Sequence, residues 1–266
     1  REKGIRWTPF LLLPYWDPTR LTVVDVMHAL LEGVVQTHVR SVHSLESEKA
    51  DKLEKTSLKG KQRAQPKIKS LNEQLYEACL IRENSDGTDD TYLEEGPSSG
   101  KILDAEVLLE IRKDTSRTIK PTWVASVPNN FGSKSHGRLK AAEWRILISL
   151  YLPISLGRLW GIGGKYHQTC IWYYQNTMML VAAVLLATSR QTSNCHAKAY
   201  TYYMSEYLRG LKRLFPTMKF RDNHHVALHI EEFLILLGPV HSWWMFPFER
   251  LIGRLQKITT NGLVGE

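Results

Sequence analysis

Four polar residues lie at helical spacing in an otherwise apolar stretch near the start of the chain. Asp25, His28, Glu32 and Gln36 follow one another at spacings of three, four and four residues, which places them in one stripe of a helix. Buried polar groups need partners, because unpaired ones are costly. Aspartate, histidine and glutamate can all ligate a divalent cation, which would suit a catalytic or metal-proximal site. The alternative is an internal hydrogen-bonded network that only holds the helix in place.

A single carboxylate stands in the aromatic stretch GPVHSWWMFPFERLIGRLQK, residues 238–257. On the helix predicted there, Gly253 lies one turn after Glu249 and leaves room for a ligand to approach the acid. A carboxylate in this position could meet Mg²⁺ together with aspartates from elsewhere and serve two-metal phosphoryl transfer. The alternative is a structural ion pair with Arg250 or Arg254.

Two histidines, His225 and His229, lie four residues apart in NHHVALHIEE. This spacing puts both rings on one face of a helix, as in helical zinc pairs, and Glu232 follows three residues later. No glutamate occupies the position that a HExxH zinc protease requires, which excludes that class. The pair is therefore only a weak metal candidate, and histidines with ordinary hydrogen-bond partners are the alternative.

The overall charge is compatible with a polyanionic partner. The 266 residues carry 35 Lys and Arg against 27 Asp and Glu, a formal net charge of +8 that permits nonspecific contacts with phosphates. Many basic proteins bind no nucleic acid, so charge alone assigns no function. The 3 cysteines are widely spaced and form no CxxC, which favours a reducing compartment over a disulfide framework. No P-loop, GxSxG or GxGxxG motif is present, and no signal peptide is apparent.

The elements that must position these residues are predicted to be nearly all helical, because apolar residues recur at helical spacing. One helix is expected to be kinked near Pro153. Another is expected to begin with Asp222 or Asn223 as its cap and to end at Gly238. The predicted helices cover residues 22–42, 101–115, 141–160, 168–190, 195–215, 222–238 and 247–258.

Composition divides the chain into three parts. Residues 1–43 form an N-terminal helical segment with the D-x-x-H pattern, and residues 44–100 are charged and predicted to be a disordered insertion. Residues 101–266 form a helical C-terminal domain that ends in the helix containing PFER. The apolar run Met178–Thr188 has 11 residues, which is too short to span a bilayer. We therefore expect a buried core helix there and no membrane contact.

Three stretches of the chain resemble fungal CACTA-type (En/Spm-like) DDE transposases. The stretches are WTPFLLLPYWDPTRLTVVDVMH at residues 7–28, PNNFGSKSHGRLKAAEWR at 128–145, and DNHHVALHIEEFLILLGPVHSWWMFPFERLIGRLQK at 222–257. The last stretch is similar to a pattern, GP…W…PFER…G.L, that plant members of the family share. Together the three stretches touch both ends and the centre of the chain, so the resemblance covers most of the part predicted to be ordered.

The resemblance implies a fold and a chemistry. It implies an RNase H-like transposase core interrupted by a helical insertion, so this mainly α chain would hold the insertion and the C-terminal end of the core. Such enzymes cut DNA and join strands with two aspartates, one glutamate and Mg²⁺ or Mn²⁺. Asp25 and His28 match the D-x-x-H signature that follows the second catalytic aspartate, and Glu249 is the expected catalytic glutamate and metal ligand.

The resemblance also implies partners and a location. DNA, in the form of transposon ends, would be the partner of the intact enzyme, and a homo-oligomer would be compatible with the family. We expect Arg250, Arg254 and Lys257 to bind DNA phosphates. The expected location is the nucleus.

The chain departs from the family pattern at the catalytic aspartates. Both should lie upstream of Asp25, but the sequence starts at Arg1 and Asp17 stands in a proline turn. One carboxylate cannot hold a two-metal site. We therefore expect a transposase fragment that is inactive alone, with Mg²⁺ or Mn²⁺ bound only in the intact enzyme. The alternative is a domesticated, non-catalytic module that binds DNA or protein.

Overall fold

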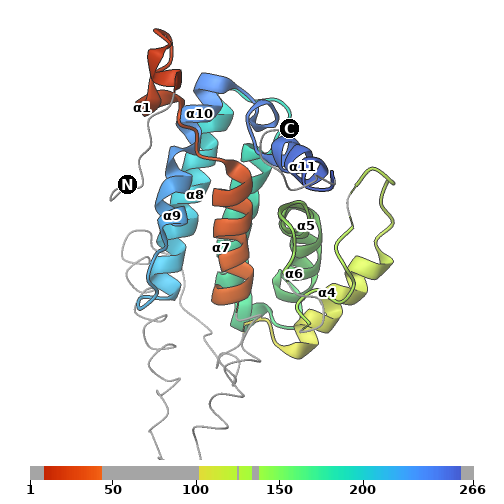
Figure 1. Cartoon of the computed structure of the whole chain (residues 1–266). Helices are drawn as coiled ribbons and strands as arrows, with labels where there is room; N and C mark the ends of the chain where they lie inside the picture. Colours follow the sequence, from red (N-terminus) through yellow and green to blue (C-terminus); the bar gives the residue numbers. More distant parts are fainter. Residues whose placement is uncertain (1–8, 44–101, 125, 134–137, 259–266) are drawn as a thin grey trace, which may run out of the picture.

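The computed structural model describes residues 9–43, 102–124, 126–133 and 138–258 (Figure 1). Within these ranges every regular element is a helix and no strand occurs, which confirms the prediction of a mainly α chain. The charged insertion predicted for residues 44–100 lies outside the described residues.

The helices agree closely in position with the sequence prediction. Three of them, η1, η5 and η6, are 3-10 helices, and η2, η3 and η4 are π-helices. In chain order the helices are η1 (Pro9–Leu12), α1 (Pro18–Leu21), η2 (Met27–Val35), η3 (His38–Val42), α4 (Ala105–Arg117), α5 (Ala141–Ile146), η4 (Leu147–Tyr151), α6 (Leu152–Trp160), α7 (His167–Ala187), α8 (Asn194–Leu214), α9 (Asp222–Val226), η5 (Ala227–His229), α10 (Ile230–Leu237), η6 (Val240–Ser242) and α11 (Phe246–Leu255).

The antiparallel pair α7 and α8 forms the centre of a helical bundle (Figure 1). A short connection reverses the chain, and Ser193 caps α8 by accepting the N–H of His196 at 3.2 Å. Helix α6 packs on α7, α10 packs on α8, and η2 contacts both α5 and α9. Because successive long helices run in opposite directions, the start of η2, the α7–α8 turn and the residues after α10 come to the same end of the bundle (Figure 1).

The helix expected over residues 22–42 begins later, at Val26. The carboxylate of Asp25 accepts hydrogen bonds from the N–H groups of Met27 and His28 at 3.2 and 3.1 Å. Asp25 therefore caps the start of this helix. Most of the helix is π-helical, with N–H groups that bond carbonyls five residues earlier. At its end, for example, the N–H of His43 donates to the carbonyl of His38 at 2.9 Å.

Two other expected helices differ in detail from their prediction. The interruption near Pro153 takes the form of the π-helical turn η4, because proline has no N–H to donate to the preceding turn. The cap predicted at Asp222 or Asn223 is wrong, since Arg221 precedes α9 and its N–H donates to the His224 Nδ1 atom at 3.0 Å. The predicted end at Gly238 is confirmed, with a φ of 78° that glycine adopts readily.

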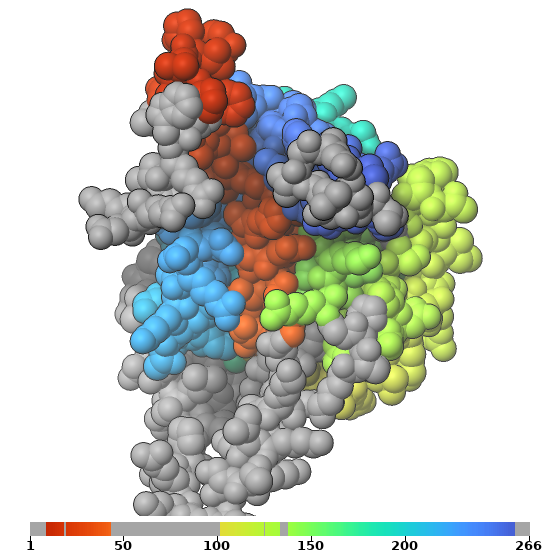
Figure 2. Space-filling view, viewed as in Figure 1, coloured from red at the N-terminus to blue at the C-terminus, as the bar shows by residue number. Residues whose placement is uncertain are grey.

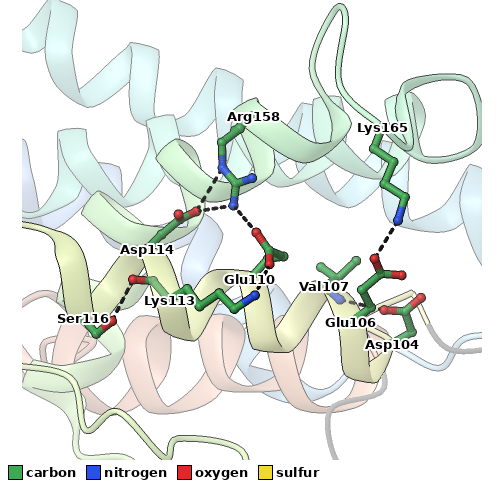
Figure 3. A network of polar contacts seen from close by, with 9 residues as sticks. All are labelled: Asp104, Glu106, Val107, Glu110, Lys113, Asp114, Ser116, Arg158 and Lys165. Atoms are coloured by element: carbon green, nitrogen blue, oxygen red, sulfur yellow. Dashed lines mark hydrogen bonds and ion pairs between the residues drawn. The ribbon is translucent and has the colours of Figure 1, made fainter.

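Helix α4 is attached to the bundle by a buried apolar stripe and by surface ion pairs (Figure 3). The guanidinium of Arg158 on α6 donates to Asp114 at 2.9 Å and to Glu110 at 3.0 Å. Lys165, in the turn that follows α6, donates to Glu106 at 2.6 Å. The network is exposed, so it sets the orientation of α4 more than it stabilises the fold.

Helix α7 is the one helix in the described ranges that is long and apolar enough to cross a membrane, judged by length and composition. Half of the most apolar 18-residue stretch of this helix is buried inside the bundle. The helix packs against both α6 and α8. This packing is what a core helix shows, as predicted for Met178–Thr188.

Candidate functional site

Asp25 connects the two ends of the described chain through both of its carboxylate oxygens. Its Oδ1 atom accepts the backbone N–H of Met27 at 3.2 Å and that of Met245 at 3.0 Å. Its Oδ2 atom accepts the backbone N–H of His28 at 3.1 Å and the ring Nδ1–H of the same residue at 2.5 Å. Four donors therefore occupy the two oxygens, which makes Asp25 a helix cap and a tether with little capacity left for a metal ion.

The contact with Asp25 fixes the orientation of His28. Because an ionised carboxylate only accepts hydrogen bonds, the Nδ1 atom of His28 donates and the Nε2 atom faces outward. There it lies 3.8 Å from the Oε1 atom of Glu249. The side chains of His28 and Glu249 are about half exposed, at 52% and 53%, whereas that of Asp25 is 12% exposed. The three residues predicted to be catalytic thus lie together, with the acidic end open to solvent.

The rest of the polar stripe takes no part in this cluster. Glu32 and Gln36 lie further along the same helix and are half-buried. Figure 2 shows that this helix (orange) reaches the surface as a band between the blue helices and the green part of the chain. The stripe is thus where an otherwise buried helix meets solvent, and only its first turn joins Glu249.

Helix α11 carries Glu249 on an open surface. Nothing lies within 4 Å of the position that a Cβ atom at Gly253 would take, as expected for a helix that a ligand can approach. The predicted DNA-binding residues Arg250, Arg254 and Lys257 are all exposed. In the described ranges Glu249 forms no ion pair with Arg250 or Arg254, so the alternative of an arginine pair does not describe this structure. Its contact with a basic group is to the ring of His28, which makes an ion pair only when the imidazole is protonated.

A second polar cluster, which the sequence did not predict, lies inside the bundle. The hydroxyl of Thr177 donates to the carbonyl of Tyr173 at 2.7 Å. It therefore accepts from the Nε2 atoms of His38 and His43, at 3.0 and 3.3 Å. The hydroxyl of Tyr207 in turn donates to the Nδ1 atom of His38 at 3.2 Å. Every bond in this set is consistent with two neutral histidines.

Burial keeps these two histidines neutral. Burial is the largest cause that lowers the pKa of His38, followed by the nearby His43 and His224. Burial likewise lowers the pKa of His43 to about 3. The cluster is thus structural at neutral pH and joins η3 to α7 and α8. Its signal in the sequence is a five-residue spacing, which a turn of π-helix aligns and a search at α-helical spacing passes over.

The predicted pair His225 and His229 does share one face. Their Nε2 atoms lie 3.5 Å apart, and Glu232 accepts the Nδ1–H of His229 at 3.1 Å. This leaves the Nε2 atom of His229 as an acceptor, in the arrangement by which a carboxylate orients a metal-binding histidine. Both imidazoles are exposed, and no third protein donor joins them within the described chain.

The described residues do not build a complete metal centre by themselves. Among them no group of three or more His, Cys, Asp or Glu side chains is placed to hold a metal ion. Asp25 is saturated with donors, whereas Glu249 is exposed and has a single ion-pair contact, with His28. The described part of the cluster therefore offers one exposed carboxylate, that of Glu249, next to the ring of His28.

Comparison with known proteins identifies no relative of this chain. No family model matches it, and neither a curated protein nor a solved structure matches it. Function must therefore be inferred from the contacts at the start of η2 and α11 and from the stretches that carry the resemblance.

Proposed function

We propose that this chain is part of a DDE-type DNA transposase in which Glu249 supplies a carboxylate ligand to the Mg²⁺ or Mn²⁺ of the strand-cleavage site. One observation supports the proposal above the others: the His28 Nε2 atom lies 3.8 Å from Glu249 Oε1. The D-x-x-H stretch and the PFER stretch come from opposite ends of the chain, and the family resemblance independently assigns both to one catalytic site.

The residues of the cluster would divide the work. Asp25 holds the ring of His28 through its Nδ1 atom and holds the start of α11 through the N–H of Met245. A protonated His28 would in turn attract the carboxylate of Glu249, whose Oε1 atom lies 3.8 Å from its Nε2 atom. A bound divalent metal would polarise the scissile phosphate and generate the attacking hydroxide.

The remaining ligands would come from outside the described residues. Since the cluster offers one free carboxylate, the other acids and the strands of an RNase H-like core that would carry them are proposed to belong to the full-length protein. We therefore expect no strand cleavage by this chain alone. A nuclear location and assembly with further copies on transposon ends would accompany this role.

A non-catalytic DNA-binding module is the second candidate function. The saturation of Asp25 by four donors favours it, because a residue used only as cap and tether needs no metal. The net charge of +8 would then serve to hold DNA phosphates.

The discriminating experiment uses the full-length gene product and a supercoiled plasmid with Mn²⁺. Loss of a metal ligand removes several kcal/mol of transition-state stabilisation, so Glu249→Gln should lower the cleavage rate about a thousandfold. Glu231→Gln, on the neighbouring α10, is the matched control and should cleave normally.

The outcomes separate the two candidates. Metal-dependent cleavage that is lost in Glu249→Gln supports the transposase. DNA binding that weakens with salt but is never followed by cleavage supports the binding module. Cleavage that persists unchanged in Glu249→Gln contradicts the role of Glu249.

A further inference from the structure

Two arginines and a histidine, Arg145, Arg190 and His241, lie in elements that border the Asp25 site. The guanidinium of Arg145, on α5, sits over the ring of Trp244 with its Cζ atom 5.6 Å from the ring centroid. The ring of His241 packs against the same tryptophan at 4.2 Å, and Phe246 contacts it at 4.7 Å. The ring of Trp244 therefore contacts both the guanidinium of Arg145 and the imidazole of His241.

Arg190, in the turn between α7 and α8, adds a second arginine to the cluster. Burial is the main cause that lowers the pKa of Arg145, and the charge of Arg190 lowers it further. The pKa of His241 falls through burial first, then through Arg190 and Arg145. The turn that carries Arg190 and the segment that carries His241 lie at the same end of the bundle (Figure 1). The two arginines are therefore the cations of this group, and His241 is its neutral member.

Nothing among the described residues neutralises this charge. No carboxylate in the described ranges forms an ion pair with Arg145 or with Arg190, and the Nδ1 atom of His241 is buried without a hydrogen-bond partner. Like charges that gather without a counter-ion oppose folding, and an unpartnered buried nitrogen adds to that cost. An anion that binds between them would relieve both.

The position of the cluster indicates which anion. Trp244 immediately precedes Met245, whose N–H donates to Asp25, and α5 packs directly on η2. The cations therefore border the cluster that holds Glu249. Helix α11, which follows Met245, carries the exposed basic residues Arg250 and Arg254. A chain of phosphates would follow such a path, whereas a single carboxylate would use only one part of it.

We propose that Arg145, Arg190 and His241 form a binding site for a phosphodiester group of DNA next to Glu249, with Trp244 as the support that orients Arg145. The assignment rests on the proposed function for the chemistry next to it, but it names residues that the family resemblance did not. Arg145 and Arg190 donate to phosphate oxygens, and His241 packs beside them on the ring of Trp244.

The test measures binding of the 266-residue chain to a short fluorescein-labelled duplex by fluorescence anisotropy over a range of NaCl concentrations. Arg190→Gln changes an exposed residue, and Arg145→Gln changes a partly buried one, whose fold is checked by its melting curve. Each variant should weaken binding about tenfold at low salt. Each should also reduce the slope of log K against log salt by about 0.9, the value for one phosphate contact.

Arg213→Gln is the matched control. Arg213 is exposed in the last turn of α8, about 30 Å along that helix from the end next to Arg190, and its loss should leave the salt slope unchanged. The inference is overturned if Arg190→Gln and Arg145→Gln bind with the slope of the unaltered chain, or if the unaltered chain shows no salt-dependent binding. Titration with inorganic phosphate distinguishes DNA from a free anion. If Arg190→Gln abolishes the binding of inorganic phosphate but leaves the binding of the duplex unchanged, the site binds a free anion instead of DNA.

Failure of this inference and failure of the proposed function give different results. Glu249→Gln should bind the duplex no more weakly than the unaltered chain, because it removes a negative charge and no cation. If cleavage depends on Glu249 but Arg190→Gln binds DNA as the unaltered chain does, the proposed function stands and the phosphate site is contradicted.

Discussion

The backbone N–H of Met245 donates to the Asp25 Oδ1 atom at 3.0 Å, a contact between residues at opposite ends of the described chain. The same carboxylate caps the helix that begins at Val26 and holds the ring of His28. One side chain therefore decides both where the first long helix starts and where the segment that leads into α11 is placed. The distance between His28 and Glu249 depends on it.

Replacement of Asp25 should consequently destabilise the protein more than loss of an ordinary helix cap. Asp25→Ala removes a cap worth about 1 kcal/mol and a hydrogen bond from Met245 to a charged group worth about 1.5–3 kcal/mol. We expect the free energy of unfolding to fall by about 2.5–4 kcal/mol, measured by urea denaturation. Proteolysis should also become faster between α10 and α11.

Asp104→Ala is the control for this prediction. Asp104 caps α4 by accepting the N–H of Val107 at 2.7 Å and is not tied to α11, so its loss should cost about 1 kcal/mol. Equal losses in the two variants would show that the Met245 contact contributes nothing to stability.

The buried histidines His38 and His43 should make stability depend on pH. A histidine in the unfolded chain titrates near pH 6.5, whereas the pKa of His43 in the fold is about 3. Between these values the unfolded state binds more protons than the fold. The contribution of the neutral histidines to the free energy of unfolding is therefore complete above about pH 6.5 and is lost as the pH falls below it. Each histidine contributes a slope of about 1.4 kcal/mol per pH unit, which urea denaturation at a series of pH values would measure.

The variant His43→Leu isolates this effect from the titration of carboxylates. It removes one titrating group, so the pH slope between about pH 6 and pH 4 should become shallower by about 1.4 kcal/mol per pH unit, whatever the variant costs at neutral pH. An unchanged slope would mean that His43 takes up its proton at the same pH in the folded and unfolded chains, which would contradict a buried, neutral His43.

Gly210 on α8 packs against the side chain of Asn176 on α7. A Cβ atom there would lie 2.0 Å from the Oδ1 atom and 2.9 Å from the Cγ atom of Asn176, whose side chain is buried. Gly210→Ala should therefore destabilise the protein by about 1–3 kcal/mol through overpacking.

Gly157→Ala, at another helical glycine, should have the opposite effect on stability. Its new Cβ atom would meet the hydroxyl of Tyr174 at 3.5 Å, an ordinary contact, so the gain in helix propensity should stabilise the protein by about 0.5–1 kcal/mol. Thermal melting of both variants would check the pair, and equal stabilisation would contradict the close packing at Gly210.

Zinc should bind His225 and His229 only weakly. The two Nε2 atoms converge at 3.5 Å, but structural zinc sites use four protein ligands and catalytic sites three, and Glu232 is already used by His229 Nδ1. We expect no saturable zinc binding at micromolar concentrations in isothermal titration calorimetry. Stoichiometric binding that disappears in His225→Ala would instead show that a third ligand reaches the pair.

Local patterns in the sequence were sufficient to locate most helices. The apolar periodicity of α4, α7 and α8 and the stop at Gly238 depend only on neighbouring residues, so they could be predicted. The late start at Val26 and the wrong cap for α9 have a different origin. Both follow from side chains, Asp25 and His224, that choose among several local hydrogen-bond partners.

The sequence by itself determined which residue types were available at the candidate site: a D-x-x-H pattern, one glutamate in PFER and a basic surface. Only the tertiary structure decided that Asp25 caps and tethers, that His28 faces Glu249, and that Arg145 meets Trp244. These contacts join segments far apart along the chain, and periodicity contains no information about such pairs. The buried pair His38 and His43 was missed for a related reason, since the π-helical backbone that aligns them is itself a consequence of packing in the bundle.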